Sequence, residues 1–265
     1  MNDTMPLPYL DAHCHLDFAR NGRLLGDAAA CAGVRALSAT VTPAGYERAR
    51  LLFAGCPAVL VGLGLHPWWV ADGSCREAEI ARFEELAARA RFIGEIGLDF
   101  ARRREGTREA QTAAFERAVR AGVTGGKVVS LHAVCAADEV LDALERFECT
   151  TDNACILHWF SGSNDALVRA VRLGCYFSVN PRMLATKRGR AYAKAIPADR
   201  LLVETDWPSG PCGDTTFSEW ADLLRHTVGA LAELRGEDVV ERMDRTAREV
   251  FDALPPGGGE EAVAQ

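Results

Sequence analysis

Eight short apolar runs alternate with longer amphipathic stretches along almost the whole chain of 265 residues. The runs are rich in Val, Ile and Leu and do not alternate strictly with polar residues, which indicates parallel strands buried on both faces. They are Tyr9–Ala12, Val34–Val41, Ala58–Leu65, Phe92–Ile96, Lys127–Leu131, Cys155–Leu157, Cys175–Val179 and Leu201–Val203. Eight strands that alternate with helices predict an α/β fold, a (β/α)8 TIM barrel in a single domain. An open doubly wound sheet is the alternative arrangement.

The stretches between the runs show the three- to four-residue apolar spacing of helices. The clearest are Ile80–Leu86, Gln111–Gly122, Phe217–Leu231 and Glu237 to about Ala253, and Thr216 or Ser218 is the candidate cap of the third. No linker or change of composition divides the chain, so we expect one barrel domain over residues 1–254. Residues 255–265, PPGGGEEAVAQ, contain too little apolar surface to pack and predict a disordered tail.

Charge and cysteine usage limit the location and the partners. With a net charge of −7, the chain as a whole does not attract a polyanion, so contact with DNA would need bound cations or a local basic patch. The nine cysteines occur singly and form no C-x-x-C pair, which fits a reducing cytoplasm. Neither a signal peptide nor an apolar run of membrane-spanning length is recognisable, so we expect a cytoplasmic protein without membrane contact.

Residue types that bind metal ions recur at the ends of the predicted strands. Side chains two positions apart in a strand point to the same face, so His13 and His15 can converge on one ion. Glu95 ends an apolar run, where a carboxylate is costly to bury unless a cation or a hydrogen bond compensates it. The flanking Gly94 and Gly97 allow other groups to approach the backbone closely. The complete candidate set is His13, His15, Glu95, His132, His158 and Asp206.

These six residues belong to predicted strands one, four, five, six and eight, at the ends that form the catalytic face of a (β/α)8 barrel. Four imidazoles and two carboxylates exceed the needs of one tetrahedral site. They suit a centre of two divalent ions with Glu95 as the bridge. Nitrogen and oxygen ligands without thiolate favour Zn, Mn, Co or Fe over a purely magnesium site, although Mg-supported activity remains open.

With these residues in place, the chain resembles the TatD family of metal-dependent deoxyribonucleases, which belong to the amidohydrolase-type barrels. The matching segments are DAHCHLDF at 11–18, GLGLHPW at 62–68, GEIGLDF at 94–100, LHWFSGS at 157–163, YFSVNPRML at 176–184 and LLVETDWP at 201–208. The resemblance implies a (β/α)8 barrel that hydrolyses phosphodiester bonds in DNA with two divalent ions. It further implies that His13, His15 and Asp206 hold one ion, that His132 and His158 hold the other, and that Glu95 bridges them.

The chain departs from the family pattern at two places. Val134 stands where family members commonly have an arginine, two residues after the histidine of strand five. Ser209–Gly213 replaces an Arg-Asn-Glu-Pro-like segment after the final aspartate. Both elements could hold phosphate or shape the substrate mouth, so the resemblance transfers the metal site more directly than the substrate.

The predicted catalytic residues are Asp206, as the general base, and Glu95. We expect His66 to hydrogen-bond a substrate phosphate and Arg102, in a run of three arginines, to contact another. The expected substrate is DNA, as single strands or ends, because an enclosed barrel mouth admits a flexible strand more readily than a duplex. Two alternatives remain open: hydrolysis of another ester or an amide, including an aminoacyl ester on RNA, and a subunit of a larger complex with a vestigial site, whose protein partner the sequence does not identify.

Overall fold

The computed structural model describes residues 5–122, 125–236 and 238–252. Its strands form one parallel sheet in which the spatial order follows the chain order from β1 to β8. They are β1 (Leu10–Cys14), β2 (Arg35–Ala39), β3 (Val59–Leu65), β4 (Phe92–Asp99), β5 (Val128–Val134), β6 (Ala154–His158), β7 (Tyr176–Val179) and β8 (Leu201–Val203). This order confirms the predicted barrel and rules out the doubly wound sheet, in which the strand order reverses at a switch point.

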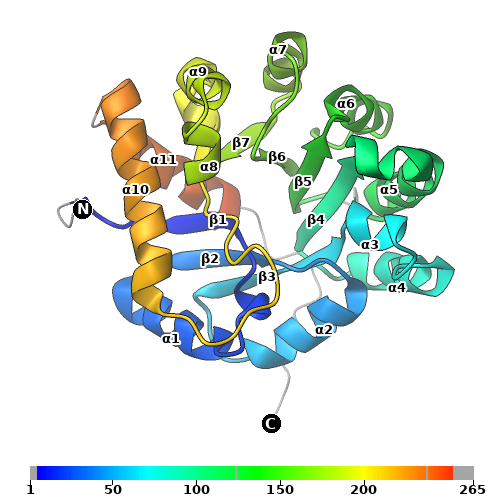
Figure 1. Cartoon of the computed structure of the whole chain (residues 1–265), viewed down its shortest axis with the longest axis horizontal. Coiled ribbons are helices and arrows are strands. Elements are labelled where there is room, and N and C mark those ends of the chain that lie inside the picture. The colour runs from blue at the N-terminus through cyan, green and yellow to red at the C-terminus, as the bar shows by residue number, and fades with distance from the viewer. Residues whose placement is uncertain (1–4, 123–124, 237, 253–265) are drawn as a thin grey trace.

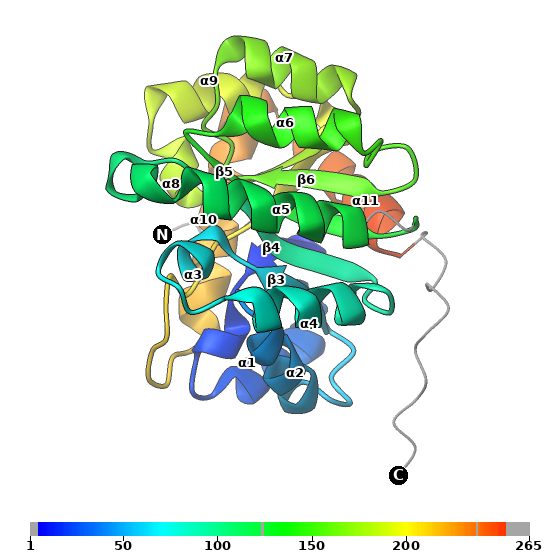
Figure 2. The same ribbon diagram turned by 90° about the vertical axis from the view of Figure 1, so that its right-hand side faces the viewer.

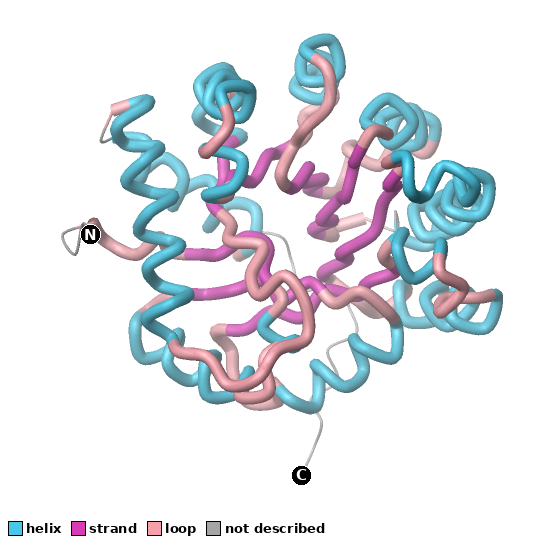
Figure 3. Tube along the Cα trace, in the orientation of Figure 1, coloured by secondary structure: helices cyan, strands magenta, loops and turns pink. Residues whose placement is uncertain are grey.

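Helices surround the strands on the outside, as Figures 1 and 2 show. The α-helices are α1 (Gly22–Ala32), α2 (Pro43–Leu52), α3 (Pro67–Ala71), α4 (Glu77–Ala87), α5 (Arg108–Gly122), α6 (Ala137–Arg146), α7 (Asn164–Arg172), α8 (Pro181–Leu184), α9 (Lys187–Ala195), α10 (Phe217–Arg235) and α11 (Asp238–Phe251). The 3-10 helices are η1 (Leu16–Phe18), η2 (Arg102–Thr107) and η3 (Ala198–Arg200). Figure 3 shows the resulting two layers, with strands inside and helices outside.

The ring of strands is completed by the segment that follows β8. The backbone N–H of Asp206 donates to the carbonyl of His13 at 2.9 Å, and that of His15 donates to the carbonyl of Trp207 at 2.9 Å. The first and last strands therefore meet through residues of the metal-ligand set.

The four helices predicted from apolar spacing are present as α4, α5, α10 and α11. Thr216 caps α10, and with Glu219 it forms a capping box that satisfies two free N–H groups at the helix start. Glu237 and Ala253, the predicted bounds of the last helix, lie outside the described residues, and so does the predicted tail at 255–265. None of the described helices is long and apolar enough to cross a membrane.

Helix α11 covers the N-terminal end of the barrel. Val250 and Phe251 pack into an apolar cluster with the first residues of several strands, among them Leu10 and Phe92. The rings of Phe92 and Phe251 stack with their centroids 6.0 Å apart. This cluster fills the interior at the end opposite the predicted metal ligands.

Irregularities in β1 and β4 turn two ligands inward. In β4, Phe92 belongs to the interior cluster, whereas Ile93 and Ile96 both belong to the core between strands and helices, although they are an odd number of positions apart, three. The β4–β5 register shifts between Ile93 and Ile96, and the extra residue turns Glu95 toward the interior. The β1–β2 register shifts in the same way just before His13, between Asp11 and Cys14.

Two strands, β4 and β5, extend further along the chain than predicted. Glu95 lies in the middle of β4 and His132 lies within β5, and neither is at the end of its strand. The apolar runs of these two strands predicted ends at Ile96 and Leu131. The polar residues beyond remain in the ladder because they are buried and paired.

Candidate metal centre

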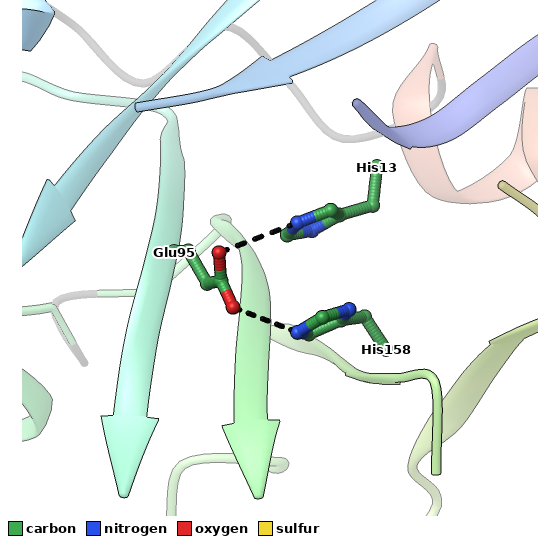
Figure 4. Close-up of side chains that lie close together, drawn as sticks. All are labelled: His13, Glu95 and His158. Carbon is green, nitrogen blue, oxygen red and sulfur yellow. Dashed lines mark hydrogen bonds and ion pairs between the residues drawn. The ribbon is translucent and has the colours of Figure 1, made fainter. Parts of the chain in front are cut away.

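All six predicted ligands come together at the C-terminal end of the barrel interior. Glu95, which is 2% exposed, lies at the centre of the group. Its Oε1 is 2.6 Å from Nδ1 of His132 and 2.8 Å from Nε2 of His158, while its Oε2 is 3.5 Å from Nε2 of His13 and 3.6 Å from Nε2 of His15. Figure 4 shows the carboxylate between His13 and His158. Oε2 of Glu95 thus faces His13 and His15, whereas Oε1 faces His132 and His158, with His66 beside them at 3.1 Å.

The first set consists of His13, His15 and Asp206 together with Glu95 Oε2. Asp206 Oδ1 is 3.3 Å from Nε2 of His15 and 3.9 Å from Nε2 of His13. Zn–N bonds of about 2.0 Å in a tetrahedron place neighbouring ligand atoms about 3.3 Å apart. The separations in this set, from 3.3 to 3.9 Å, are therefore close to those between atoms that share one ion.

The second set consists of His132 and His158 together with Glu95 Oε1. Nδ1 of His132 and Nε2 of His158 face each other at 3.3 Å. Two unprotonated ring nitrogens at this distance would repel each other, so at least one of them must hold a proton or a cation. This set therefore also has the spacing and the chemistry of a cation site.

In His13 and His15, the ring nitrogen that points away from Glu95 is held by a hydrogen-bond partner. Nδ1 of His15 lies 2.6 Å from the carbonyl oxygen of Ala39. A carbonyl only accepts, so Nδ1 donates to it and Nε2 is the ring nitrogen that faces the centre. Nδ1 of His13 lies 2.7 Å from Oγ of Ser130, which leaves Nε2 of His13 buried without a hydrogen-bond partner among the described residues.

Carboxylates face the outward nitrogens of the other two histidines. Nε2 of His132 is 3.6 Å from Oδ2 of Asp99, and Nδ1 of His158 is 3.7 Å from Oε1 of Glu204. Carboxylates in this position orient ligating imidazoles and raise their basicity.

Both carboxylates are held by further contacts. Asp99 accepts a hydrogen bond from Nε1 of Trp68 and pairs with Arg104 at 3.2 Å. Glu204, fully buried, accepts hydrogen bonds from Ser178 and from Asn180. The sequence interpretation missed Asp99 and Glu204, although each follows an apolar run at a strand end, the same signal that identified Asp206.

The electrostatics of the centre favour bound cations. Burial raises the pKa of Glu95, but the surrounding histidines outweigh burial and hold that pKa well below its usual range. Burial lowers the pKa of His15, but its hydrogen bond with Asp206 and the charge of Glu95 outweigh burial and raise it to about 9. The carboxylates thus remain ionised, and they draw positive charge, as protons or as metal ions, onto the ligand set.

Asp206 has a strained backbone that the surrounding structure holds in place. Its φ of 52° lies in the left-handed region, which non-glycine residues rarely adopt. The preceding Thr205 is fixed by Asp11, whose carboxylate accepts from both the N–H and the hydroxyl of Thr205 and from Nε1 of Trp220. Asp11, at the start of the DAHCH segment, therefore positions the last ligand.

His66 lies beside the second set with a different protonation. Its Nδ1 accepts a hydrogen bond from the N–H of Trp68 at 3.1 Å, and its Nε2 is 3.1 Å from Oε1 of Glu95. Burial lowers the pKa of His66 to about 4 despite the charge of Glu95, so the ring is neutral and its proton is on Nε2. A nitrogen that carries a proton is a donor, so His66 offers a hydrogen bond into the centre, where the six-residue set offers lone pairs.

The centre opens into a cavity of about 500 Å³. His66, Val134 and Arg103 line this cavity together with most of the ligands. Arg102, the predicted phosphate contact, begins η2 and is exposed, and it does not line the cavity. The structure thus brings His66 to the centre and places Arg103, the neighbour of Arg102, at its rim.

Comparisons with known proteins agree with the predicted family. The model of the family described as TatD related DNase matches residues 10–254. The 3'-5' ssDNA/RNA exonuclease TatD of Enterobacter lignolyticus is 32% identical over 188 residues, 66% of this chain and 70% of the relative. The uncharacterized metal-dependent hydrolase YcfH of Escherichia coli K12 is 31% identical over 246 residues, 88% of this chain and 90% of the relative.

Solved structures show the same fold. The TatD homolog YjjV of Escherichia coli K12 superimposes with a TM-score of 0.77, at 21% identity, over 93% of this chain and 99% of that one. The resemblance seen in the sequence motifs is therefore confirmed along nearly the whole chain.

Proposed function

The chain belongs to the TatD related DNase family of metal-dependent ester hydrolases, and from this premise we propose that it hydrolyses phosphodiester bonds in DNA, at single strands or ends. The observation that carries the proposal is the division of the Glu95 carboxylate between two pairs of histidines. One carboxylate shared by two ligand sets is the arrangement of a two-metal hydrolytic centre.

The two ligand sets are the residues that would hold the ions. His13, His15 and Asp206 would hold one ion, His132 and His158 would hold the other, and the Glu95 carboxylate would serve both. The orphaned Nε2 of His13 and the facing nitrogens of the second set support this assignment. Two divalent ions, Zn, Mn or Mg, would supply an activated water and neutralise the phosphoryl oxygens during an in-line displacement.

The protein's own groups handle the proton and the orientation of the substrate. Asp206 faces the cavity and its pKa is held low, since its contact with His15 outweighs burial, so it is ionised and accepts the proton of the attacking water. His66 donates a hydrogen bond from its Nε2–H to a phosphoryl oxygen at the second site. Glu95 fixes the spacing of the two ligand sets.

The size of the cavity supports single strands or ends as substrate. At about 500 Å³, it is in the usual range of about 300–1,000 Å³ for small-molecule sites. A site of this size holds a nucleotide that has been separated from a duplex. The nine cysteines, all unpaired in the structure, support the cytoplasmic location that we also propose.

The test uses end-labelled single- and double-stranded oligonucleotides with chelator-treated protein to which Mg, Mn or Zn is added back. We expect metal-dependent shortening of the single strand and no cleavage in chelator. Val134 contributes no positive charge to the cavity, so simple esters, amides and an aminoacyl ester on RNA are assayed in parallel. Turnover of one of these, with no cleavage of DNA, would overturn the proposal.

The replacement Asp206→Asn tests the role of the general base. We expect turnover to fall at least about a hundredfold, on the scale of a lost electrostatic group in an active site. The second site should still bind metal, as measured by mass spectrometry of the dialysed protein. Full activity of this variant would contradict the assignment of Asp206.

A further inference from the structure

Two arginines lie at the rim of the cavity, one on each side of the strands that carry the second ligand set. Arg103 follows β4 in η2, and Arg182 follows β7 in α8. Strands β5 and β6, which carry His132 and His158, lie between β4 and β7 in the barrel (Figure 1). Among the described residues that line the cavity, no other lysine or arginine is present.

Neither rim arginine is neutralised by a carboxylate. Arg104, next to Arg103, pairs with the buried Asp99 at 3.2 Å. Arg103 and Arg182, in contrast, have no acidic partner within 4.0 Å among the described residues. A ligand anion can therefore reach both guanidinium groups without breaking an ion pair.

Each of these guanidinium groups is held against an indole ring. Arg182 lies 5.6 Å from the ring centre of Trp159, and Arg103 lies 5.3 Å from that of Trp68, a ring that Arg104 also approaches at 4.2 Å. A cation–π contact of this kind limits where the guanidinium can lie and uses none of its N–H donors, so these donors remain free for phosphate.

Both tryptophans are connected to the metal centre. Trp159 directly follows the candidate ligand His158, and its backbone N–H donates to the carbonyl of Ser178 at 3.2 Å. Trp68 donates its Nε1–H to Asp99, which faces His132. The positions of the arginines are thus tied to the second ligand set.

A further contact fixes the turn that carries Arg182. Asn180 is fully buried, and its side chain accepts from the N–H of Met183 at 2.8 Å and donates to Glu204 at 2.7 Å. Glu204 in turn faces His158. The turn that carries Arg182 is therefore connected to the candidate metal ligand His158 through Asn180 and Glu204.

From these contacts we propose that Arg103 and Arg182 form a binding site for the phosphates that flank the scissile phosphate in a single-stranded nucleic acid. The proposal rests on the proposed function and adds the residues that hold the single-stranded nucleic acid. Val134 leaves the end of β5 uncharged, so the cations of the cavity come from η2, after β4, and from α8, after β7. In a chain with a net charge of −7, such local cations are needed to hold a polyanion.

The first experiment compares two substrates in Arg103→Gln, Arg182→Gln and the double variant. One substrate is a ten-residue thymidine oligonucleotide, and the other is bis(4-nitrophenyl) phosphate, which has no flanking phosphates. We expect the ratio of kcat/KM for the oligonucleotide to that for the small diester to fall about tenfold for each arginine, the usual effect of a lost charge-assisted hydrogen bond.

Two charge-matched variants serve as comparisons. Arg190→Gln removes one exposed positive charge on α9, away from the cavity, and should leave the ratio unchanged. Arg102→Gln tests the neighbour that the sequence suggested, and its effect should be smaller than that of Arg103→Gln. An equal or larger effect of Arg102→Gln would move the contact to that residue.

The second experiment measures binding of the labelled oligonucleotide at several salt concentrations in the Asp206→Asn background. Each phosphate contact on a single strand contributes about 0.7 to the slope of log affinity against log salt, so each Arg→Gln change should reduce the slope by about that amount. Arg182→Lys should keep the slope, because the charge is retained, and should bind more weakly, because the stacked fork is lost.

The outcomes separate this proposal from the proposed function. An unchanged substrate ratio and an unchanged salt slope, in enzyme that still degrades the oligonucleotide, would overturn the phosphate site and leave the nuclease proposal standing. Failure of the wild-type, metal-loaded enzyme to cleave any oligonucleotide would overturn the nuclease proposal, and this one with it.

Discussion

The two ends of the barrel interior are built from opposite kinds of side chain. At the N-terminal end, α11 and the first residues of the strands form a cluster of apolar groups, with Phe92 against Phe251. At the C-terminal end, the equally buried Glu95 is surrounded by imidazoles, and Nε2 of His13 lacks a hydrogen-bond partner within the described structure. Burial alone therefore does not distinguish the two ends.

The difference shows where stability and function reside. Apolar burial at the N-terminal end contributes directly to the free energy of folding. Buried charges contribute little net stability, since desolvation offsets their attraction, so the polar end is retained for what it binds. Replacements at the two ends should accordingly separate unfolding free energy from metal content and turnover.

The largest effect is expected for Glu95→Gln. The amide has one oxygen and cannot bridge two ligand sets as a charged group, so we expect loss of metal from the protein and a fall in turnover of about a thousandfold or more. Metal content by mass spectrometry and oligonucleotide cleavage measure the two effects. Glu85→Gln, at an exposed position on α4, is the control. If the variant retains both ions, Glu95 is not the bridge.

Phe251→Ala tests the opposite end. Removal of the ring leaves a cavity against Phe92, and we expect the free energy of unfolding to fall by about 3–5 kcal/mol. Urea denaturation of the metal-free protein measures this, and the folded fraction should still bind metal normally. Leu51→Ala, at a side chain that is 78% exposed, should change stability little. Equal losses in the two variants would contradict the assigned role of α11.

Gly97→Ala should change both stability and metal binding, because the backbone of Gly97 pairs with that of the candidate ligand His132. A Cβ at this position would lie 2.0 Å from the carbonyl oxygen of His132. The backbone φ of +148° is also one that residues with a side chain rarely adopt. We expect a loss of about 1–3 kcal/mol in unfolding free energy together with weaker metal binding at the second site. Gly106→Ala, where nothing lies within 4 Å of the added atom, is the matched control. Unaltered metal affinity would show that β5 adjusts without moving His132.

The smallest effect is expected for Ser130→Ala. It removes the partner of Nδ1 of His13, so the ring loses its fixed orientation and metal affinity at the first site should fall about tenfold. Competition with a fluorescent chelator measures the affinity. The exposed Ser74→Ala should give the wild-type value. A stability loss without a change in affinity would mean that Ser130 serves packing only.

The fold and the convergence of the six candidate ligands could be predicted because they depend on local patterns. Apolar runs and helical spacing define the elements, and parallel strands in chain order place their C-terminal ends at one face. His13, Glu95 and Asp206 were recognised as polar residues adjoining such runs.

The inward direction of Glu95 could not be predicted. Strict alternation places it on the same face as Ile93, which packs against the helices. Its direction follows from the register shift against β5 and from the hydrogen bond of its N–H to the carbonyl of Thr40 at 2.8 Å, which depend on neighbouring strands. The roles of Asp99 and Glu204 also depend on which imidazole each one faces, and that is decided by the three-dimensional arrangement.

The position of α11 has a consequence for folding of the protein while it is synthesised on the ribosome. The N–H of Tyr9, next to β1, bonds to Asp244 of α11 across 235 residues of chain. At about 5–20 residues per second, translation of that interval takes about 12–47 s. Throughout it, the inward face of Leu10 lacks the helix that covers it, and so does that of Phe92 once this residue has been synthesised. The nascent barrel is therefore open to chaperones, and to aggregation, until its last helix emerges from the exit tunnel.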